Sequence, residues 1–232
     1  MLHKGGEVAL KSWLCMCFVL FFLTILASGC APSDAQEYIE LPLDSGSLSI
    51  PVEKVEPLHK FLESYTPSER QVEISRIQGT AFRSLTGIVY GDIRFNCGSK
   101  LCDHVLVQMK DEAFKSLSLH EGSLWISHSF SPDERLLAIL LGRNEGTELV
   151  RNRIMILHTE TLEPAVVWGD PVVTEQALSS DFVFPILDVK WVHETSLEIT
   201  VPDTPDNSYE TLLEWNRTGK TTKTIRLSVT PK

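Results

Sequence analysis

The sequence lacks an apolar run long enough to cross a bilayer. Its longest run, from Trp13 to Ser28, has sixteen residues, and a helix of that length spans roughly 24 Å at 1.5 Å per residue. The hydrocarbon core of a bilayer is about 30 Å thick, which disfavours a permanent transmembrane helix. The basic Lys11 at the start of the run and the small side chains at its end, residues 27–29, are typical of a secretory signal that is cleaved.

Basic residues are also few, with 21 Lys and Arg against 31 Asp and Glu. Removing residues 1–29 takes away Lys4, Lys11 and Glu7, which leaves 19 basic and 30 acidic residues and a formal net charge of −11. Nucleic acids and anionic lipids attract proteins through Lys and Arg. We therefore expect no nucleic-acid partner, and we expect membrane attachment to depend on something other than surface charge.

Only five cysteines are present, and two of them, Cys15 and Cys17, lie inside the predicted signal. A third, Cys30, ends the stretch LASGC at residues 26–30, which resembles the lipobox of bacterial lipoproteins. That resemblance implies that the Cys30 thiol is diacylated and that the chain is cut just before it. Two acyl chains hold a soluble domain on a bilayer without a spanning helix. The alternative is a spare cysteine in an uncleaved helix.

These features predict a lipid-anchored protein on the extracytoplasmic face of the cell membrane, with Cys30 as its first mature residue. Residues 4–7 can be encoded by a purine-rich string that resembles a ribosome-binding site, so translation starts either at Met1 or at Val8. The expected parts are a lipoprotein signal peptide at 1–29, a tether at 30–51 with a short strand at Ser47–Ile50, and a β-rich domain at 52–232.

The two remaining cysteines, Cys97 and Cys102, form a C-x4-C pair. Gly98 and Ser99 between them signal a turn, and strand-like segments flank the pair, so the two sulfurs can meet across a hairpin as a structural disulfide. Zinc would need further Cys or His ligands, and only His104 is close in sequence. A thioredoxin-type redox pair uses C-x-x-C at a helix start. We therefore predict a disulfide, and neither a metal nor a cofactor.

One stretch of the mature chain has helical spacing. Val55, Leu58 and Leu62 recur on one face, and Thr66-Pro67 is interpreted as a stop, so one short helix is expected near 53–66. From about residue 78 onward the sequence breaks into short β-rich runs separated by turn residues, which predicts an all-β, mainly antiparallel fold. The runs are TGIVYGDIRF, DHVLVQM, SLWISHSF, LLAILLG, RIMILH, AVVW, LDVKWV, SLEITV, ETLLEW and TKTIRLSV.

Two stretches about 60 residues apart look like copies of one unit of paired strands. If they are equivalent, the two aromatic residues that precede the turns are buried on matching strands, while Asp133 and Glu194 lie at exposed turns. The equivalent pairs are Phe130 with Trp191, Leu136 with Leu197, and Leu157 close to Trp215.

The stretch FSPDERLLAI, followed by RIMILHTETLEPAVV, resembles the repeat of TolB-like β-propellers, in which an aromatic-Ser-Pro-Asp turn joins two strands. A third, degenerate unit is expected around Phe95 to Met109. Two or three blade-like units are too few to close a propeller, which takes four to eight blades, so we expect a partial propeller or a sandwich. The resemblance implies a binding or scaffolding role and supplies no catalytic residue.

Catalytic motifs are missing, since the sequence contains no G-x-S-x-G, no H-E-x-x-H and no P-loop. Asp103 and His104 are neighbours, but adjacent side chains point to opposite faces of a strand. The segment PDTPDNSYE gathers oxygen ligands without the spacing of a calcium loop. We therefore expect a non-enzymatic envelope lipoprotein that binds a protein partner or ligand. The alternative is an envelope hydrolase with an unrecognised site.

Trp168 is the residue that we expect to contact a partner. It ends a predicted strand just before Gly169-Asp170-Pro171, and a ring at a strand end can reach solvent. Trp191 and Trp215 occupy repeat positions where the fold requires bulky inner side chains, so we expect both to be part of the core.

Overall fold

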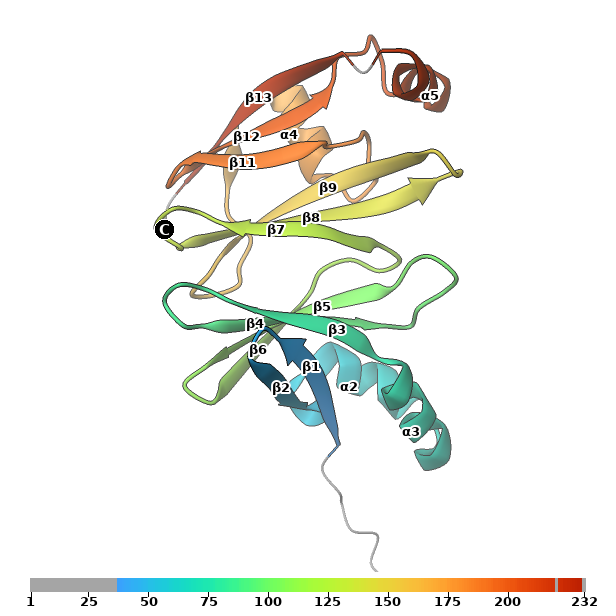
Figure 1. Cartoon of the computed structure of the whole chain (residues 1–232), viewed down its shortest axis with the longest axis vertical. Helices are drawn as coiled ribbons and strands as arrows, with labels where there is room; N and C mark the ends of the chain where they lie inside the picture. The colour runs from blue at the N-terminus through green and yellow to red at the C-terminus, as the bar shows by residue number, and fades with distance from the viewer. Residues whose placement is uncertain (1–36, 220, 231–232) are drawn as a thin grey trace, which may run out of the picture. The chain divides into compact units, whose positions relative to one another are not determined.

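The computed structural model describes residues 37–219 and 221–230, and this part of the chain is mainly antiparallel β-structure (Figure 1). The predicted fold class is confirmed. The strands form one hairpin and three larger sheets, and none of these sheets closes on itself within the described residues. The hairpin consists of β1 (Tyr38–Leu43) and β2 (Gly46–Pro51).

The three larger sheets follow one another along the chain. The first sheet has the order β3 (Gln78–Arg83), β4 (Val89–Phe95), β5 (Asp103–Lys110) and β6 (Ala113–Ser118). The middle sheet has the order β7 (Leu124–Phe130), β8 (Leu136–Glu145) and β9 (Leu149–His158). The last sheet has the order β11 (Asp188–His193), β12 (Ser196–Pro202), β13 (Thr222–Val229) and β10 (Val167–Trp168).

Helical segments connect these strands or cover them. In the described residues they are the 3-10 turn η1 (Val52–Lys54) and the helices α2 (Glu56–Glu63), α3 (Pro67–Arg76), α4 (Pro171–Leu178) and α5 (Tyr209–Thr218). The sequence predicted α2 and no other helix. The expectation of a single short helix was therefore wrong in number, although α2 lies where that helix was predicted.

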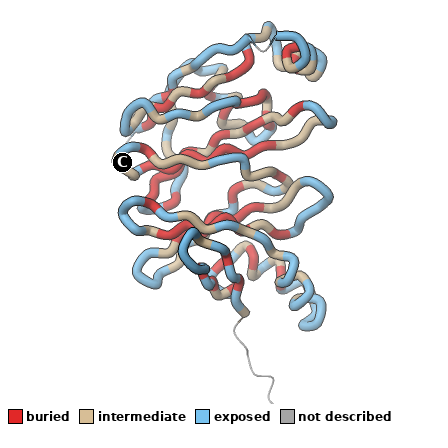
Figure 2. The backbone as a smooth tube through the Cα atoms, viewed as in Figure 1, coloured by how far each residue is buried: buried red, intermediate tan, exposed pale blue. Residues whose placement is uncertain are grey.

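Strand β8 lies at the centre of the core because its apolar run is buried on both faces. The run LLAILL covers residues 136–141, and successive side chains of a strand point to opposite faces. The even-numbered side chains pack with the last sheet, and the odd-numbered ones pack with the first sheet. The middle sheet therefore lies between the other two, and buried residues run through this layer (Figures 1 and 2).

The two outer faces of this stack differ in character. The outer face of the first sheet is apolar and is covered by the β1–β2 hairpin and α2. Leu41 lies so close to it that a Cβ added at Gly91 would come within 2.6 Å of the Leu41 Cδ1. The outer face of the last sheet is polar, with Arg226 donating to Glu198 at 2.7 Å. The outer face of the first sheet is therefore occupied by its own chain, whereas the outer face of the last sheet is open and also carries the exposed Trp168 side chain.

The turn between β7 and β8 contains the sequence stretch that resembles a TolB-like repeat. Its side chains link the middle sheet to the first sheet. Ser131 Oγ donates to Asp133 Oδ1 at 2.7 Å, which closes the turn on itself. The Glu134 carboxylate accepts hydrogen bonds from the backbone N–H groups of Leu85 at 2.6 Å and Thr86 at 2.9 Å. Since Leu85 and Thr86 lie between β3 and β4, Glu134 links the middle sheet to the first.

The hairpins β7–β8 and β11–β12 occupy corresponding places in their sheets. Phe130 packs toward the first sheet, while Trp191 packs toward the middle sheet and donates from Nε1 to the Ser129 carbonyl at 3.2 Å. Each aromatic side chain thus faces the preceding sheet. Both are partly buried, where full burial was expected. Glu194 is exposed as predicted, but Asp133 is partly buried because it bonds its own turn.

The predicted tether at 30–51 extends too far, because the chain is folded from Tyr38 onward. Ile39 and Leu41 of β1 and Leu48 and Ile50 of β2 alternate with exposed residues and are buried. The short strand expected at Ser47–Ile50 is confirmed and lies within β2. Strand β1 was not expected, because six residues of alternation are too few to distinguish from chance in the sequence. The remainder of the expected tether lies outside the described residues.

The stop predicted at Thr66-Pro67 is the start of α3. The Thr66 backbone N–H donates to Glu69 Oε2 at 3.0 Å in a capping box, and Pro67 takes the first turn, where its missing N–H is not needed. The Thr-Pro-Ser-Glu sequence carries this signal. It was overlooked because α3 has no buried residue and therefore no apolar stripe.

The run ETLLEW, predicted as a strand, forms most of α5. Ser208 Oγ accepts from the Thr211 N–H at 3.3 Å and caps the helix. Leu212 and Trp215 are its buried residues, and their spacing of three is helical rather than alternating. The predicted equivalence of Leu157 and Trp215 was therefore wrong. The third strand of the last sheet's meander is β13.

Candidate functional site at the disulfide hairpin

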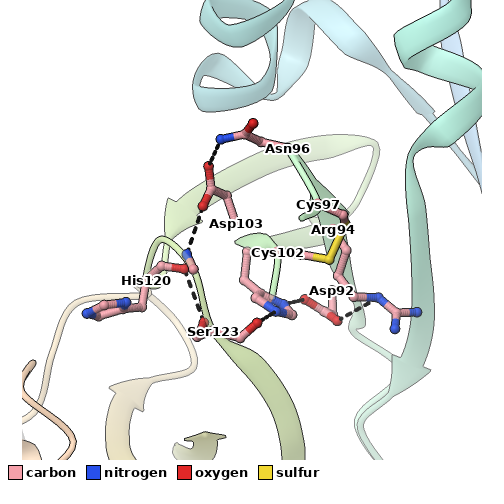
Figure 3. Close-up of a disulfide and its surroundings, with 10 residues drawn as sticks. Asp92, Arg94, Asn96, Cys97, Cys102, Asp103, His120 and Ser123 are labelled. Carbon is pink, nitrogen blue, oxygen red and sulfur yellow. Dashed lines mark hydrogen bonds and ion pairs between the residues drawn. A yellow bond between two sulfur atoms is a disulfide. The ribbon is translucent and has the colours of Figure 1, made fainter. Parts of the chain in front are cut away.

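The hairpin between β4 and β5 carries the predicted cysteine pair. Cys97 and Cys102 form a disulfide with their Cα atoms 4.0 Å apart (Figure 3). Gly98 N donates to the Leu101 carbonyl at 2.8 Å within the loop. The predicted pairing of Cys97 with Cys102 agrees with this structure. It could be predicted because the turn residues and the two cysteines lie within six consecutive residues.

Asp103 and His104 point to opposite sides of β5, as predicted. The Asp103 carboxylate accepts from Asn96 Nδ2 at 2.7 Å and from the Gly122 N–H at 2.8 Å. It thereby ties the disulfide hairpin to the loop that enters β7 (Figure 3). His104 points into the protein, toward Asp92 of the adjacent strand β4.

The pair formed by Asp92 and His104 is buried, with both side chains 1% exposed. Nδ1 of His104 lies 2.8 Å from Asp92 Oδ1, and Nε2 lies 3.1 Å from the Ser123 carbonyl oxygen. Both neighbouring oxygens are acceptors, so both contacts are hydrogen bonds when each ring nitrogen carries a proton. Arg94 Nε is 3.6 Å from Asp92 Oδ2, so a guanidinium group also lies beside the carboxylate.

Asp92, His104 and Ser123 are the residue types of a catalytic triad, but their geometry differs from one. The His104 nitrogen that would activate a nucleophile faces the Ser123 carbonyl, while Ser123 Oγ donates to the His120 carbonyl at 3.2 Å. A serine nucleophile requires its hydroxyl within reach of the base. The cluster therefore holds β4, β5 and the start of β7 together and does not activate a hydroxyl.

A groove lies above this cluster, between α2 and the strands of the first sheet. It has a volume of about 540 Å³, with Phe61, Phe95 and Leu119 as apolar lining and Lys60 and His120 among its polar residues. A second hollow of about 350 Å³ shares Phe61 and Phe95 with the groove and extends along α3. The second hollow was not predicted from the sequence, because α3 was not predicted. The groove is also lined by Asp103, His104 and Glu121.

His128 lies among aromatic side chains between the first and middle sheets. Its ring stacks on Phe82 of β3 with centroids 3.7 Å apart, and Trp125 lies at 5.7 Å. Burial lowers the pKa of His128 from its ordinary value of 6.5, and the negative charge of Asp92 opposes part of that shift. The folded protein therefore favours neutral His128.

Acidification should consequently destabilise the domain through His128. Below pH 6.5 the unfolded chain takes up a proton that the folded state resists, so the free energy of unfolding falls as the pH falls through and below that value. We expect urea midpoints to drop between about pH 7.5 and pH 5, and His128→Gln to show a smaller drop. His193→Gln, at an exposed position, is the matched control. An equal drop in His128→Gln and in the unchanged protein would contradict the assignment.

The disulfide gives a second prediction at this site. Mass spectrometry of the protein purified without reduction should find Cys97 and Cys102 inaccessible to alkylation. Closing so short a loop restricts the unfolded chain only modestly, so Cys97→Ser with Cys102→Ser should lower the free energy of unfolding by about 2 kcal/mol. Two free thiols in the protein purified without reduction would refute the prediction.

Trp168 lies away from this site, in edge strand β10 of the last sheet. Its side chain is 62% exposed, and its Nε1 donates to Thr230 Oγ1 at 2.7 Å. Of the other tryptophans in the described residues, Trp215 is buried, while Trp125 and Trp191 are partly buried. Trp168 is thus placed where a partner can reach it.

Cys30 and the predicted signal lie outside the described residues. Among the residues that the structure describes, no helix has the length and apolar character needed to span a membrane. The same residues bring together no group of three His, Cys, Asp or Glu side chains suited to a metal ion.

Comparisons with protein-family models, with curated proteins and with solved structures find no match to this chain.

Proposed function

We propose that the protein is a lipid-anchored envelope lipoprotein whose β domain binds a protein partner outside the cytoplasmic membrane and catalyses no reaction. The observation that carries this proposal is the lipobox-like stretch at residues 26–30, which follows a basic flank and a short apolar run. Acylation of Cys30 would make the membrane itself the first partner.

Two observations support the assignment to the envelope and to binding. A disulfide such as Cys97–Cys102 persists in compartments outside the reducing cytosol. Three antiparallel sheets stacked face to face are in keeping with the TolB-like blade resemblance, and that resemblance favours a scaffold that holds partners. Trp168, exposed at the edge of the last sheet, is the contact residue that we propose.

An envelope hydrolase was the alternative from the sequence. Among the described residues, the best candidate for a hydrolytic site is the Asp92–His104–Ser123 cluster. In that cluster Nε2 of His104 faces the Ser123 carbonyl oxygen and not the Ser123 hydroxyl. We therefore favour binding over hydrolysis.

The test of the anchor is metabolic labelling with an alkyne fatty acid. The unchanged protein should be labelled and cut before Cys30, whereas Cys30→Ala should show no label and remain an uncleaved precursor, because the acylated thiol is lost. Cys17→Ala is the matched control, since Cys17 lies in the segment that is removed, and it should be labelled normally. Unchanged labelling of Cys30→Ala would refute the lipoprotein proposal.

A further inference from the structure

The outer face of the last sheet is open to solvent. Leu197 and Leu227 on its inner face pack with the middle sheet, so the alternate side chains point away from the stack. On β13 these outer side chains are Thr224, Arg226 and Ser228, and all three are exposed. The sheet ends the stack on the side opposite to the β1–β2 hairpin (Figure 1). Nothing among the described residues therefore covers this face, and the strand register identifies the side chains that a ligand meets there.

The register arranges the outer side chains in rows that cross the sheet. In the first row, Trp168 of β10 lies opposite Ser228 of β13, which lies opposite Ser196 of β12. The next two rows contain only charged and hydroxyl side chains: Arg226, Glu198 and Lys190, and then Thr224, Thr200 and Asp188. The face is thus polar, with a tryptophan at its edge.

The Trp168 ring presents its apolar face to a ligand. The side chain is 62% exposed, but its one polar group is already occupied, since Nε1 donates to Thr230 Oγ1 at 2.7 Å. Thr230 N in turn donates to the Val166 carbonyl at 2.9 Å, which holds the ring beside the end of β13. A ligand therefore contacts the ring through C–H groups, which the negative face of an aromatic system attracts. A side chain that is ordered in advance also loses less conformational entropy on binding.

The charges on this face balance. Arg226 and Lys190 are offset by Glu198 and Asp188, two of each sign, although the chain from residue 30 onward has a formal net charge of −11. A face without net charge selects neither a cationic nor an anionic ligand. Serine and threonine hydroxyls both donate and accept hydrogen bonds. The chemistry of the rows therefore suits a neutral ligand that also donates and accepts.

The face by itself is smaller than a stable protein–protein interface. Its four strands, spaced about 4.8 Å apart, measure about 14 Å across, and the seven residues of β12 extend about 20 Å. The product, about 280 Å², compares with about 800 Å² per partner in a standard protein–protein interface. A short oligomeric ligand fits this area better than the surface of a folded protein.

We infer that the outer face of the last sheet binds a neutral oligosaccharide, with one sugar ring stacked on Trp168. A pyranose ring combines an apolar C–H face with a rim of hydroxyls, which matches an indole with a bonded Nε1 beside Ser228 and Ser196. The following sugars form hydrogen bonds with the charged and hydroxyl rows. A flat sheet favours an extended, β-linked chain over a coiled one. This inference goes beyond the proposed protein partner. Because Trp168 is common to both, a bound glycan and the proposed protein contact exclude each other on that ring.

The test is calorimetric titration of the full chain with chitotetraose and, separately, with cellotetraose, in a polyoxyethylene detergent whose head group carries no sugar. At least one of the two should bind with a Kd of about 1 mM or below. Trp168→Ala should weaken this binding at least about tenfold, whereas Trp168→Phe keeps an aromatic face and should stay within about threefold. Arg226→Ala removes hydrogen-bond donors from the second row and should weaken binding about threefold.

Leu85→Ala is the matched control, because Leu85 is 95% exposed but lies between β3 and β4 of the first sheet, and it should bind within about twofold of the unchanged protein. The inference is overturned if neither oligosaccharide binds, or if Trp168→Ala binds as tightly as the unchanged protein. The titration does not depend on acylation, so the labelling of Cys30 separately decides the anchor.

Discussion

Replacing His104 by alanine is expected to lower the free energy of unfolding by about 3 to 5 kcal/mol, because the substitution leaves Asp92 buried without its partner. The carboxylate cannot regain water at 1% exposure, and the remaining Arg94 Nε is 3.6 Å from it. Urea unfolding of the variant measures the loss directly. A stable variant would mean that the pair contributes little to the fold.

The controls separate the buried pair from the loss of any histidine. His193→Ala, at an exposed position of β11, should change the free energy of unfolding by less than about 0.5 kcal/mol. His104→Ala combined with Asp92→Ala should cost less than the sum of the two single changes, because the double variant leaves no uncompensated charge. Additive costs would show that the two side chains do not act as a pair.

Substitution in β8 should be equally costly on either face of the strand. Ile139 faces the first sheet and Leu140 faces the last sheet, and both are buried. Ile139→Ala and Leu140→Ala should each lower the free energy of unfolding by about 2 to 5 kcal/mol, since each leaves a cavity in a packed layer. Urea or thermal unfolding of the two variants provides the comparison.

The matched control is Leu85→Ala, which removes a leucine that is 95% exposed and should be neutral within about 0.5 kcal/mol. In a two-layer sandwich only one face of β8 would be covered, and only one of the two core substitutions would be costly. A cheap Leu140→Ala beside a costly Ile139→Ala would therefore contradict the three-layer stack.

Local patterns in the sequence were sufficient for features that depend on neighbouring residues. The run LLAILLG was predicted as a strand and forms the first part of β8. Gly98 and Ser99 specify a turn that brings Cys97 and Cys102 together. The capping box from Thr66 to Glu69 is also a local signal and marks the start of α3. Helix α3 was nevertheless not predicted, because it has no buried residue and no apolar stripe.

Only the tertiary structure decided which distant residues meet and which remain exposed. Asp92 and His104 lie on strands whose register places Arg94 opposite His104, and the depth of their burial comes from the middle sheet packed above them. Trp168 and Trp191 both lie in edge strands of the last sheet. Trp168 is exposed because it pairs with Ser228 on the outer face, whereas Trp191 pairs with Leu197 on the inner face and is partly buried against the preceding sheet. Periodicity reports the environment of a residue within its own strand, whereas contacts between sheets depend on how the whole chain packs.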